Sequence, residues 1–489
     1  MERQFYIDGT WTPAASGESF AVDNPATEAV IAQVARGDAV DVAHAVDAAK
    51  QAFAGWRWLS ANTRAEMLHE VSRQVRAHFD ELVRLLTEEE GKPVAENEEE
   101  MEWTATTFDY YAEMGRNLRG RVIPSNERSQ FNFVIKEPYG VVGCIVPWNF
   151  PLLLLAWKMA PALAAGNTVV IKPSEMTPLT TLRFVGLCCG HLPPGVVNVV
   201  TGFGDAGQAL VEHPDVPVIA FTGSVATGQK IAALAAPMMK HLHLELGGKD
   251  AFVVGPDADL DKAVEALAYA ALLNAGQVCT SSERVYVANA VRDRFAGDVA
   301  DFVRGLKLGD GLDRETDIGP MIGPVYRTKV MRHVDQAREA GARVLTGGTI
   351  PSRPGYFYEP AVLVDVTHQM TIMQEETFGP AIPIMGYASF DEAIRLVNDS
   401  RYGLGATLRA NDPKLIKRFF EEVKAGTIWI NDPLTDTYAG PFGGMKMTGG
   451  GRELGEEGLL TFLETKHVHW DFSDEPKGWW YPYGREEGG

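Results

Sequence analysis

Three kinds of feature are scarce in this 489-residue chain, and each scarcity excludes a class of protein. Four cysteines are too few for a disulfide framework at this length, so free thiols are expected. Basic residues are outnumbered, since 45 Lys and Arg face 65 Asp and Glu, and a formal charge of −20 disfavours nucleic acid and anionic lipid as partners. No apolar run reaches the ~18 residues of a membrane span, and the first residues lack a signal-peptide-like stretch. We therefore expect a cytoplasmic protein with no nucleic-acid or membrane partner.

The chain has the length and the pattern of a two-lobed α/β protein. It exceeds the roughly 250–300 residues at which a single core stops growing. Short β-rich runs alternate with helix-length segments in two stretches, which predicts two parallel sheets with crossover helices. The expected strands are 168–172, 196–200, 218–222, 242–246 and 251–254 in the first stretch, and 284–288, 342–345, 361–366, 381–387, 406–409 and 427–431 in the second. Residues 121–137 alternate with period two, which indicates an extended hairpin.

One cysteine stands apart from the other three. Cys144, Cys188 and Cys189 lie in apolar or helix-like segments without metal-ligand spacing, so we expect core positions and no metal site. Cys279 instead ends a Gly-containing loop that follows the helix-like segment 259–274. A thiolate there and the carboxylate of Glu245 would suit thioester chemistry, because the thiolate attacks a carbonyl carbon and the carboxylate activates the water that cleaves the adduct.

Seven short segments, in this order along the chain, make it resemble the aldehyde dehydrogenase superfamily. They are 147–151 (PWNFP), 172–175 (KPSE), 221–224 (FTGS), 245–249 (ELGGK), 276–279 (GQVC), 375–380 (EETFGP) and 441–446 (PFGGMK). The resemblance implies an α/β fold with two Rossmann-like lobes and a β-flap that mediates oligomerisation. The domains expected from it are a cofactor domain (1–119 and 139–247), a catalytic domain (248–463), the flap (120–138 and 464–475) and an aromatic C-terminal extension (476–489).

The resemblance also assigns catalytic roles. Cys279 would be the nucleophile, and the Asn149 amide with the Cys279 N–H would bind the oxyanion. Glu245 would activate water for thioester hydrolysis, and its presence argues for a free acid as product rather than transfer to coenzyme A. Lys158 resembles a family lysine that positions the cofactor or tunes catalytic pKa values; a lysine that merely extends from its helix to solvent is the alternative.

NAD is the expected cofactor, with NADP disfavoured because Glu175 would repel a 2′-phosphate. Lys172 and Glu175 match the adenosine-ribose pair, Glu376 the residue that holds the nicotinamide ribose, and Phe378 the ring at the nicotinamide end. The pyrophosphate is expected where a strand ends at 221–224 and a helix begins. The literal G-x-G-x-x-G at 202–207 lacks the acidic residue about 20 positions on, so we assign it to turn geometry and adenine-side packing. The complete set of expected cofactor residues is Trp148, Lys172, Ser174, Glu175, Gly204, Gly207, Phe221, Thr222, Gly223, Ser224, Gly247, Glu376 and Phe378.

The substrate is less well defined than the chemistry. The residues that match the family's substrate tunnel are Phe150, Trp157, Leu273, Val278, Thr280, Asp436 and Phe442, with 101–103 less securely placed. The aromatic wall suits aliphatic or aromatic aldehydes. Asp432 and Asp436 in the loop 432–438 would favour a cationic substrate, such as a betaine aldehyde or amino aldehyde. The sequence offers no clear arginine pair for a carboxylated substrate, and Arg284 and Arg452 are the open candidates.

Two readings from other classes compete with an NAD-dependent aldehyde dehydrogenase. One is a non-catalytic relative of the fold, which the presence of Cys279, Glu245 and Asn149 disfavours. The other is a cysteine hydrolase without redox chemistry, which would need a histidine beside Cys279; His241 and His243 instead lie in an alternating strand. A dimer or tetramer is expected, and the aromatic tail is expected to dock on a neighbouring subunit.

Overall fold

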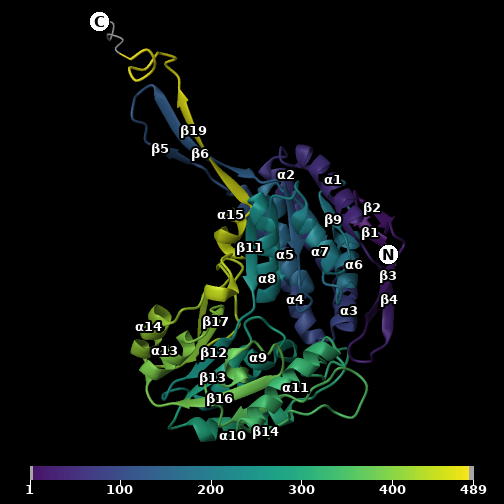
Figure 1. Cartoon of the computed structure of the whole chain (residues 1–489), viewed down its shortest axis with the longest axis vertical. Helices are drawn as coiled ribbons and strands as arrows, with labels where there is room; N and C mark the ends of the chain where they lie inside the picture. Colours follow the sequence, from purple (N-terminus) through teal and green to yellow (C-terminus); the bar gives the residue numbers. More distant parts are fainter. Residues whose placement is uncertain (1–3, 484–489) are drawn as a thin grey trace.

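The computed structural model describes residues 4–483, which form two α/β lobes and a projecting three-stranded sheet (Figure 1). The last six residues of the expected C-terminal extension, 484–489, lie outside the described residues. Within residues 4–483, no helix has both the length and the apolar composition needed to cross a bilayer.

The first lobe is built on a seven-stranded sheet of order β11-β10-β7-β8-β9-β1-β2. The first five strands in this order pair in parallel, and the N-terminal hairpin adds the last two, which are antiparallel. The strands are β7 (Val141–Ile145), β8 (Thr168–Lys172), β9 (Val197–Val199), β10 (Val218–Gly223) and β11 (His241–Leu246), with β1 (Gln4–Ile7) and β2 (Thr10–Pro13). A short pair, β3 (Ser19–Asp23) with β4 (Val30–Ala35), lies outside this sheet.

Helices cover both faces of this sheet, and successive side chains of a strand point alternately into the core on one face and the core on the other. Val141 and Ile145 pack in one cluster with α1 (Ala39–Trp56), α7 (Gly204–Glu212) and α8 (Val225–Ala235). Val142 and Cys144 point the other way, into a cluster shared with the remaining helices of the lobe. These are α2 (Ala61–Ala77), α3 (Phe79–Glu90), α4 (Val94–Arg116), α5 (Pro151–Ala165) and α6 (Pro178–Cys188).

The second lobe has its own seven-stranded sheet, of order β14-β15-β16-β13-β12-β17-β18. All neighbours pair in parallel except β14 with β15. The strands are β12 (Asp250–Val254), β13 (Ser282–Ala288), β14 (Arg343–Thr346), β15 (Ala361–Val364), β16 (Ala381–Tyr387), β17 (Gly405–Arg409) and β18 (Thr427–Ile430). The associated helices are α9 (Leu260–Leu272), α10 (Arg292–Gly305), α11 (Pro324–Glu339), α12 (Thr371–Gln374), α13 (Phe390–Asn398) and α14 (Pro413–Glu422).

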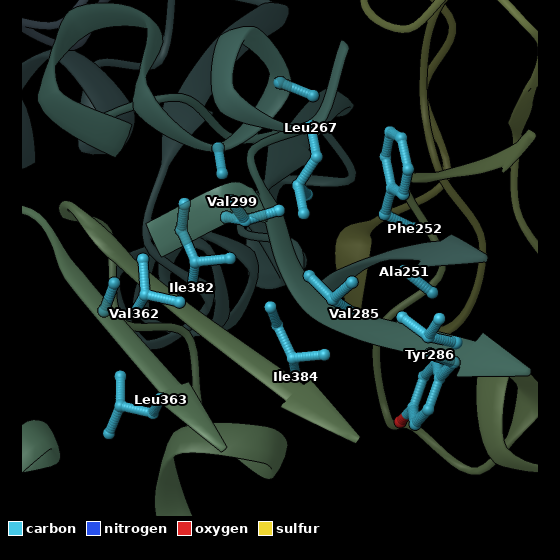
Figure 2. Packing of buried hydrophobic residues seen from close by; sticks show 14 of the residues in the cluster. Ala251, Phe252, Leu267, Val285, Tyr286, Val299, Val362, Leu363, Ile382 and Ile384 are labelled. Carbon is cyan, nitrogen blue, oxygen red and sulfur yellow. The ribbon is translucent and has the colours of Figure 1, made fainter. Parts of the chain in front are cut away.

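The core of the second lobe is continuous from its sheet to its helices. Figure 2 shows Val285, Ile382 and Ile384 of the central strands facing Leu267 and Val299 of the helices that cover them. All five side chains are buried, and burial of this kind contributes roughly 1.5–3 kcal/mol per large apolar side chain. The parallel α/β character expected for both lobes is therefore confirmed.

The third sheet extends away from both lobes (Figure 1). β6 (Gln130–Pro138) pairs antiparallel with β5 (Arg121–Ile123), so the expected hairpin is present, and β19 (Leu463–Asp471) joins on its other side. The short helix α15 (Gly455–Leu460) leads into β19. The aromatic tail follows β19 at the far end, where Trp479, Trp480, Tyr481 and Tyr483 are exposed.

Candidate active site

A cavity of about 1070 Å³ opens where the carboxyl ends of β7, β8, β10 and β11 meet. This is the edge of a parallel sheet at which ligands of doubly wound folds bind. All thirteen residues expected to hold the cofactor line this one cavity, which we call the cofactor cleft. Cys279, Asn149 and Glu245 line it as well.

The middle of the cofactor cleft presents the beginning of a helix. β10 ends at Gly223, and Ser224 caps α8, its hydroxyl accepting from the Thr227 N–H at 3.3 Å. The first N–H groups of α8 and the positive end of its dipole are suited to a pyrophosphate.

The glycines of the G-x-G-x-x-G segment fall into two groups. Gly202 has φ +155°, and a Cβ there would lie 2.9 Å from the Gly37 carbonyl oxygen, so this glycine serves the turn. Gly204 and Gly207 line the cleft, and a Cβ on either would meet no atom within 4 Å. A side chain at these two positions would therefore take up ligand space, which agrees with adenine-side packing.

One end of the cleft carries the pair expected at the adenosine ribose. The Lys172 ammonium lies 3.3 Å from the Glu175 carboxylate, and Lys172 is buried while Glu175 is half-buried. Burial lowers the pKa of Lys172, and Glu175 partly offsets that effect. Together they offer one donor and one acceptor to a sugar.

The opposite end is formed by a strained loop. Phe378 has φ +57° and packs edge-on against Trp148 at 5.4 Å between ring centroids. The Glu283 carboxylate accepts from the Thr377 and Phe378 N–H groups, each at 2.7 Å, and is ion-paired with Lys249 at 2.5 Å. This buried pair holds the loop in its unusual conformation.

Glu376 on this loop contacts the segment that joins β11 to β12. Its Oε1 accepts from the Gly248 N–H at 3.1 Å, and burial raises its pKa to about 7. A Cβ on Gly247 would lie 2.4 Å from Glu376 Oε1, so only glycine permits the approach. Of the two adjacent glutamates, Glu376 lines the cleft, whereas Glu375 pairs with Arg401 at the surface.

The three expected catalytic groups all line the cleft. Cys279 is partly buried, and both burial and the Glu245 carboxylate raise the pKa of its thiol well above the usual range. The Asn149 amide donates to the Gln277 carbonyl at 2.9 Å, which ties it to the loop that carries the thiol. The other three cysteines are buried, as expected.

Glu245 is a buried carboxylate whose two oxygens have no hydrogen-bond partner among residues 4–483. Burial raises its pKa well above the usual range, and the negative charge of Glu453 adds to the effect. A raised pKa means that the carboxylate accepts a proton more readily, so Glu245 is a suitable general base for a water molecule.

Lys158 lies behind the cleft rather than in its lining. It is fully buried, which excludes the solvent-exposed alternative, and its ammonium donates to Thr222 Oγ1 at 2.5 Å and to the Glu453 carboxylate. The Glu453 oxygen that bonds Lys158 is also 3.3 Å from His243 Nε2. Lys158 therefore bonds both Thr222, near the end of β10, and Glu453, whose negative charge helps to raise the pKa of Glu245.

A second, narrower cavity of about 150 Å³ reaches Cys279 from the other side and also borders Asn149. All seven residues expected in the substrate site line this cavity, the substrate tunnel. Of the less secure segment, Trp103 lines it, whereas Met101 is buried in the core. Asp432 is exposed and is not among the lining residues, whereas burial raises the pKa of Asp436 to about 7.

The sequence did not indicate several residues that the folded chain brings to these cavities. The additional ones are Gln208, Tyr326, Lys230, Lys329 and Arg332 in the cleft, and Glu96, Glu99, Glu100 and Tyr269 in the tunnel. Neither lining includes a histidine. The acidic run 96–100 was the one sequence signal for the tunnel carboxyl groups. It was easy to overlook, because a run of charges on a helix usually marks a face exposed to solvent.

Comparison with known proteins agrees with this geometry. A sequence model of the Aldehyde dehydrogenase family matches residues 11–468. The chain belongs to the aldehyde dehydrogenase family. Betaine aldehyde dehydrogenase 1 of Oryza sativa is 40% identical over 98% of this chain and 97% of its own length, and the peroxisomal aminoaldehyde dehydrogenase 2 of Pisum sativum is 39% identical over 98% of each.

Solved structures of family members superimpose closely on the chain. Betaine aldehyde dehydrogenase from Staphylococcus aureus in complex with NAD+ gives a TM-score of 0.96 at 36% identity, covering 98% of this chain and 97% of that one. An Escherichia coli structure described as an NADP dependent enzyme gives 0.95 at 39% identity, covering 96% and 98%. The expected family and fold are thus confirmed, while the cofactor differs among similar structures.

Proposed function

We propose that this chain oxidises small cationic aldehydes to carboxylic acids, with NAD as the oxidant. The observation that carries the reaction type is that Cys279 and Asn149 line both cavities, while Glu245 lines the cofactor cleft. One cavity has the size and the helix N-terminus for a dinucleotide, and the other admits a small molecule to the same thiol.

The residues divide the reaction between them. The Cys279 sulfur attacks the aldehyde carbon, and the Asn149 amide with the Cys279 N–H binds the resulting alkoxide. When bound, oxidised nicotinamide supplies the acceptor for the hydride that leaves this carbon. The thioester that remains on Cys279 is cleaved by a water whose proton passes to Glu245. Aldehyde, NAD+ and water thus give the acid, the reduced cofactor and a released proton.

NAD is favoured over NADP by the charge at the ribose end. Glu175 pairs with Lys172 there, so its carboxylate accepts from a free 2′-hydroxyl and repels a 2′-phosphate. Lys172 alone does not offset that repulsion, because its charge is already engaged by Glu175. The NAD+ complex of the S. aureus relative is in line with this choice.

The charge of the substrate tunnel supports a cationic aldehyde. Within the described part of the chain, its lining contains no Lys, Arg or His but includes the carboxyl groups of Glu96, Glu99 and Asp436. Burial raises the pKa of Asp436 to about 7 and that of Glu96 to about 8, so both gain negative charge as the pH rises through that range. A fourth, Glu100, is neutralised by Lys92. The rings of Trp103, Trp157, Phe150, Tyr269 and Phe442 complete the wall, and aromatic faces attract quaternary and primary ammonium groups. The rice and pea relatives carry names of betaine and amino aldehyde enzymes, which points the same way.

The test is a comparison of two aldehydes of equal shape. Betaine aldehyde and 3,3-dimethylbutanal differ in the atom that bears three methyl groups, a cationic nitrogen or a neutral carbon. With NAD, kcat/KM for the cationic substrate should exceed that for the neutral one by about tenfold, the effect of one desolvated charge contact. Reduced-cofactor absorbance reports the rate, and Cys279→Ala is the control for background oxidation. Equal kcat/KM values would contradict the substrate class, and the absence of turnover with every aldehyde would contradict the reaction.

The assembly and the compartment remain part of the proposal. A homo-oligomer, dimer or tetramer, agrees with a projecting sheet and exposed tail aromatics that would be unfavourable in a monomer. A cytoplasmic location is retained from the sequence, although the pea relative is named peroxisomal.

A further inference from the structure

A buried charged cluster, two of whose carboxyl groups also border the substrate tunnel, lies directly behind the oxyanion residue. It comprises Glu90, Lys92, Glu96, Glu100 and Asn274. Lys92 is 1% exposed, and its ammonium is ion-paired with Glu100 and, at 3.3 Å, with Glu90. Burial lowers the pKa of Lys92, but the two carboxylates more than offset this, so its pKa is raised overall and the lysine is a permanent cation.

The chain is built to bring this lysine inside. α3 ends at Gly91, which has φ +87° and where a Cβ would lie 2.5 Å from Pro320 Cγ and 2.7 Å from Pro25 Cγ. Glycine at this position therefore permits both the left-handed turn and the close contact. The next residue, Lys92, is directed into the protein, and its ammonium lies 3.7 Å from the centre of the Phe150 ring.

Two donors of the cluster converge on one atom, the carbonyl oxygen of Asn149. Lys92 Nζ donates to it at 3.2 Å and Asn274 Nδ2 at 2.9 Å, which occupies both lone pairs of the oxygen. The second hydrogen of the Asn274 amide goes to Glu90 Oε1 at 2.9 Å. The peptide that follows Asn149 is thus fixed by two hydrogen bonds from a buried network.

The same cluster fixes the segment on each side of the oxyanion site. Glu100 Oε1 accepts from the N–H groups of Leu152 and Leu153, at 3.0 and 3.1 Å, and so caps α5 immediately after Asn149. Glu96 Oε2 accepts from the Asn274 N–H at 2.9 Å, and Asn274 itself has φ +50° at the start of the loop that leads to Cys279. The cluster therefore joins the oxyanion donor to the nucleophile loop.

We propose that Lys92, together with Asn274, is a positioning residue for the Asn149 amide. Neither side chain touches the substrate carbonyl; they hold the Asn149 peptide so that its amide stays at the distance from Cys279 at which an alkoxide forms. Oxyanion stabilisation is sensitive to such distances, because a donor must lie within about 2.7–3.1 Å of the developing charge. The inference rests on the proposed aldehyde oxidation, in which Asn149 binds that alkoxide.

A double-mutant cycle separates positioning from general stabilisation. The four proteins are the wild type, Lys92→Met, Asn149→Ala and the double variant, with Lys240→Met as matched control. Lys240 is also a lysine that donates to backbone carbonyls, those of His213 and Val216, and it lines neither cavity. Rates are measured for aldehyde oxidation with NAD and for p-nitrophenyl acetate without cofactor. In the ester reaction Cys279 attacks the ester carbonyl, p-nitrophenolate leaves, and the acyl thioester is hydrolysed, so the same oxyanion forms.

Asn149→Ala should lower both rates by about 10²–10³-fold, the usual effect of losing an oxyanion donor. Lys92→Met should lower kcat about tenfold in the wild-type background with little change in KM, and less than about twofold in the Asn149→Ala background, because the residue on which it acts is gone. Lys240→Met should leave both rates unchanged.

An equal factor for Lys92→Met in the two backgrounds, or no effect in the wild type, would overturn the proposal. Should Lys92→Met fail to fold, because Glu90 and Glu100 lose their counter-charge, Asn274→Gly enters the same cycle with the same expected pattern. Glycine tolerates the positive φ at that position and introduces no charge. Ester cleavage that follows this pattern in a protein without aldehyde oxidation would contradict the proposed function and leave the positioning role intact.

Discussion

The cofactor cleft and the substrate tunnel meet at one thiol but differ in charge. The cleft lining combines four cations, Lys172, Lys230, Lys329 and Arg332, with the carboxyl groups of Glu175, Glu245 and Glu376, whereas the tunnel lining has carboxyl groups and, within residues 4–483, no cationic side chain. The whole chain carries a formal charge of −20, so the net charge gives no sign of the four basic side chains gathered in the cleft. This difference suits an anionic cofactor in the cleft and, under the proposed function, a cationic aldehyde in the tunnel.

The two cavities also differ in how their walls are held. The cleft is built on the carboxyl ends of parallel strands within one sheet. The second lobe adds the start of α11 and the Glu376 to Phe378 segment, which is fixed by the buried Glu283–Lys249 pair. The tunnel is assembled from α4, α5, α9 and the loop around Asp436, which are far apart in sequence. A change in the cleft should therefore affect the redox half of the reaction, and a change in the tunnel should affect substrate choice.

The largest expected effect separates the two halves of the reaction at Glu245. Glu245→Gln keeps the shape of the pocket but removes the base, so the thioester should form and persist. Rapid mixing of the variant with NAD and betaine aldehyde should give a burst of reduced cofactor close to one equivalent per site, followed by turnover at least about 10²-fold slower than in the wild type. A steady-state rate like that of the wild type would show that another group activates the water.

The next largest effect concerns the cleft alone. Glu175→Ala removes the carboxylate beside Lys172, so the repulsion of a 2′-phosphate ends and the freed lysine attracts it. The ratio of kcat/KM for NAD to that for NADP should fall by about 10–100-fold, because one repulsive charge next to the 2′-phosphate is replaced by one attractive charge. The preference between betaine aldehyde and 3,3-dimethylbutanal should not change. A change in aldehyde preference would show that the cleft and the tunnel are not independent.

The sequence predicted the features of the two cavities that depend on short contiguous segments of the chain. Strand ends and the turns after them place Thr222, Ser224 and Glu245 together, because parallel strands end at one edge of a sheet. Glu96 and Tyr269 were missed, since an acidic run and a lone tyrosine on helices more often belong to solvated faces. Only the folded arrangement of α4 and α9 brings them into the lining of the tunnel that also contains Cys279. The carbonyl of Asn149 was equally hidden, because the sequence does not show which side chains converge on a backbone atom.

The smallest expected effect is a pH dependence confined to the tunnel. Burial raises the pKa of Asp436 to about 7 and that of Glu96 to about 8, so both carboxyls gain charge as the pH rises from 6 to 9. Betaine aldehyde is a cation throughout, and its kcat/KM relative to that of 3,3-dimethylbutanal should rise about three- to tenfold over this range. The ionisations of Cys279 and Glu245 act on both substrates and cancel in the ratio. Asp436→Asn should flatten the rise near pH 7 and leave the part near pH 8 that belongs to Glu96. A ratio independent of pH in the wild type would mean that neither carboxyl contacts the cationic group, and the tunnel would then select its substrate by shape and aromatic contact.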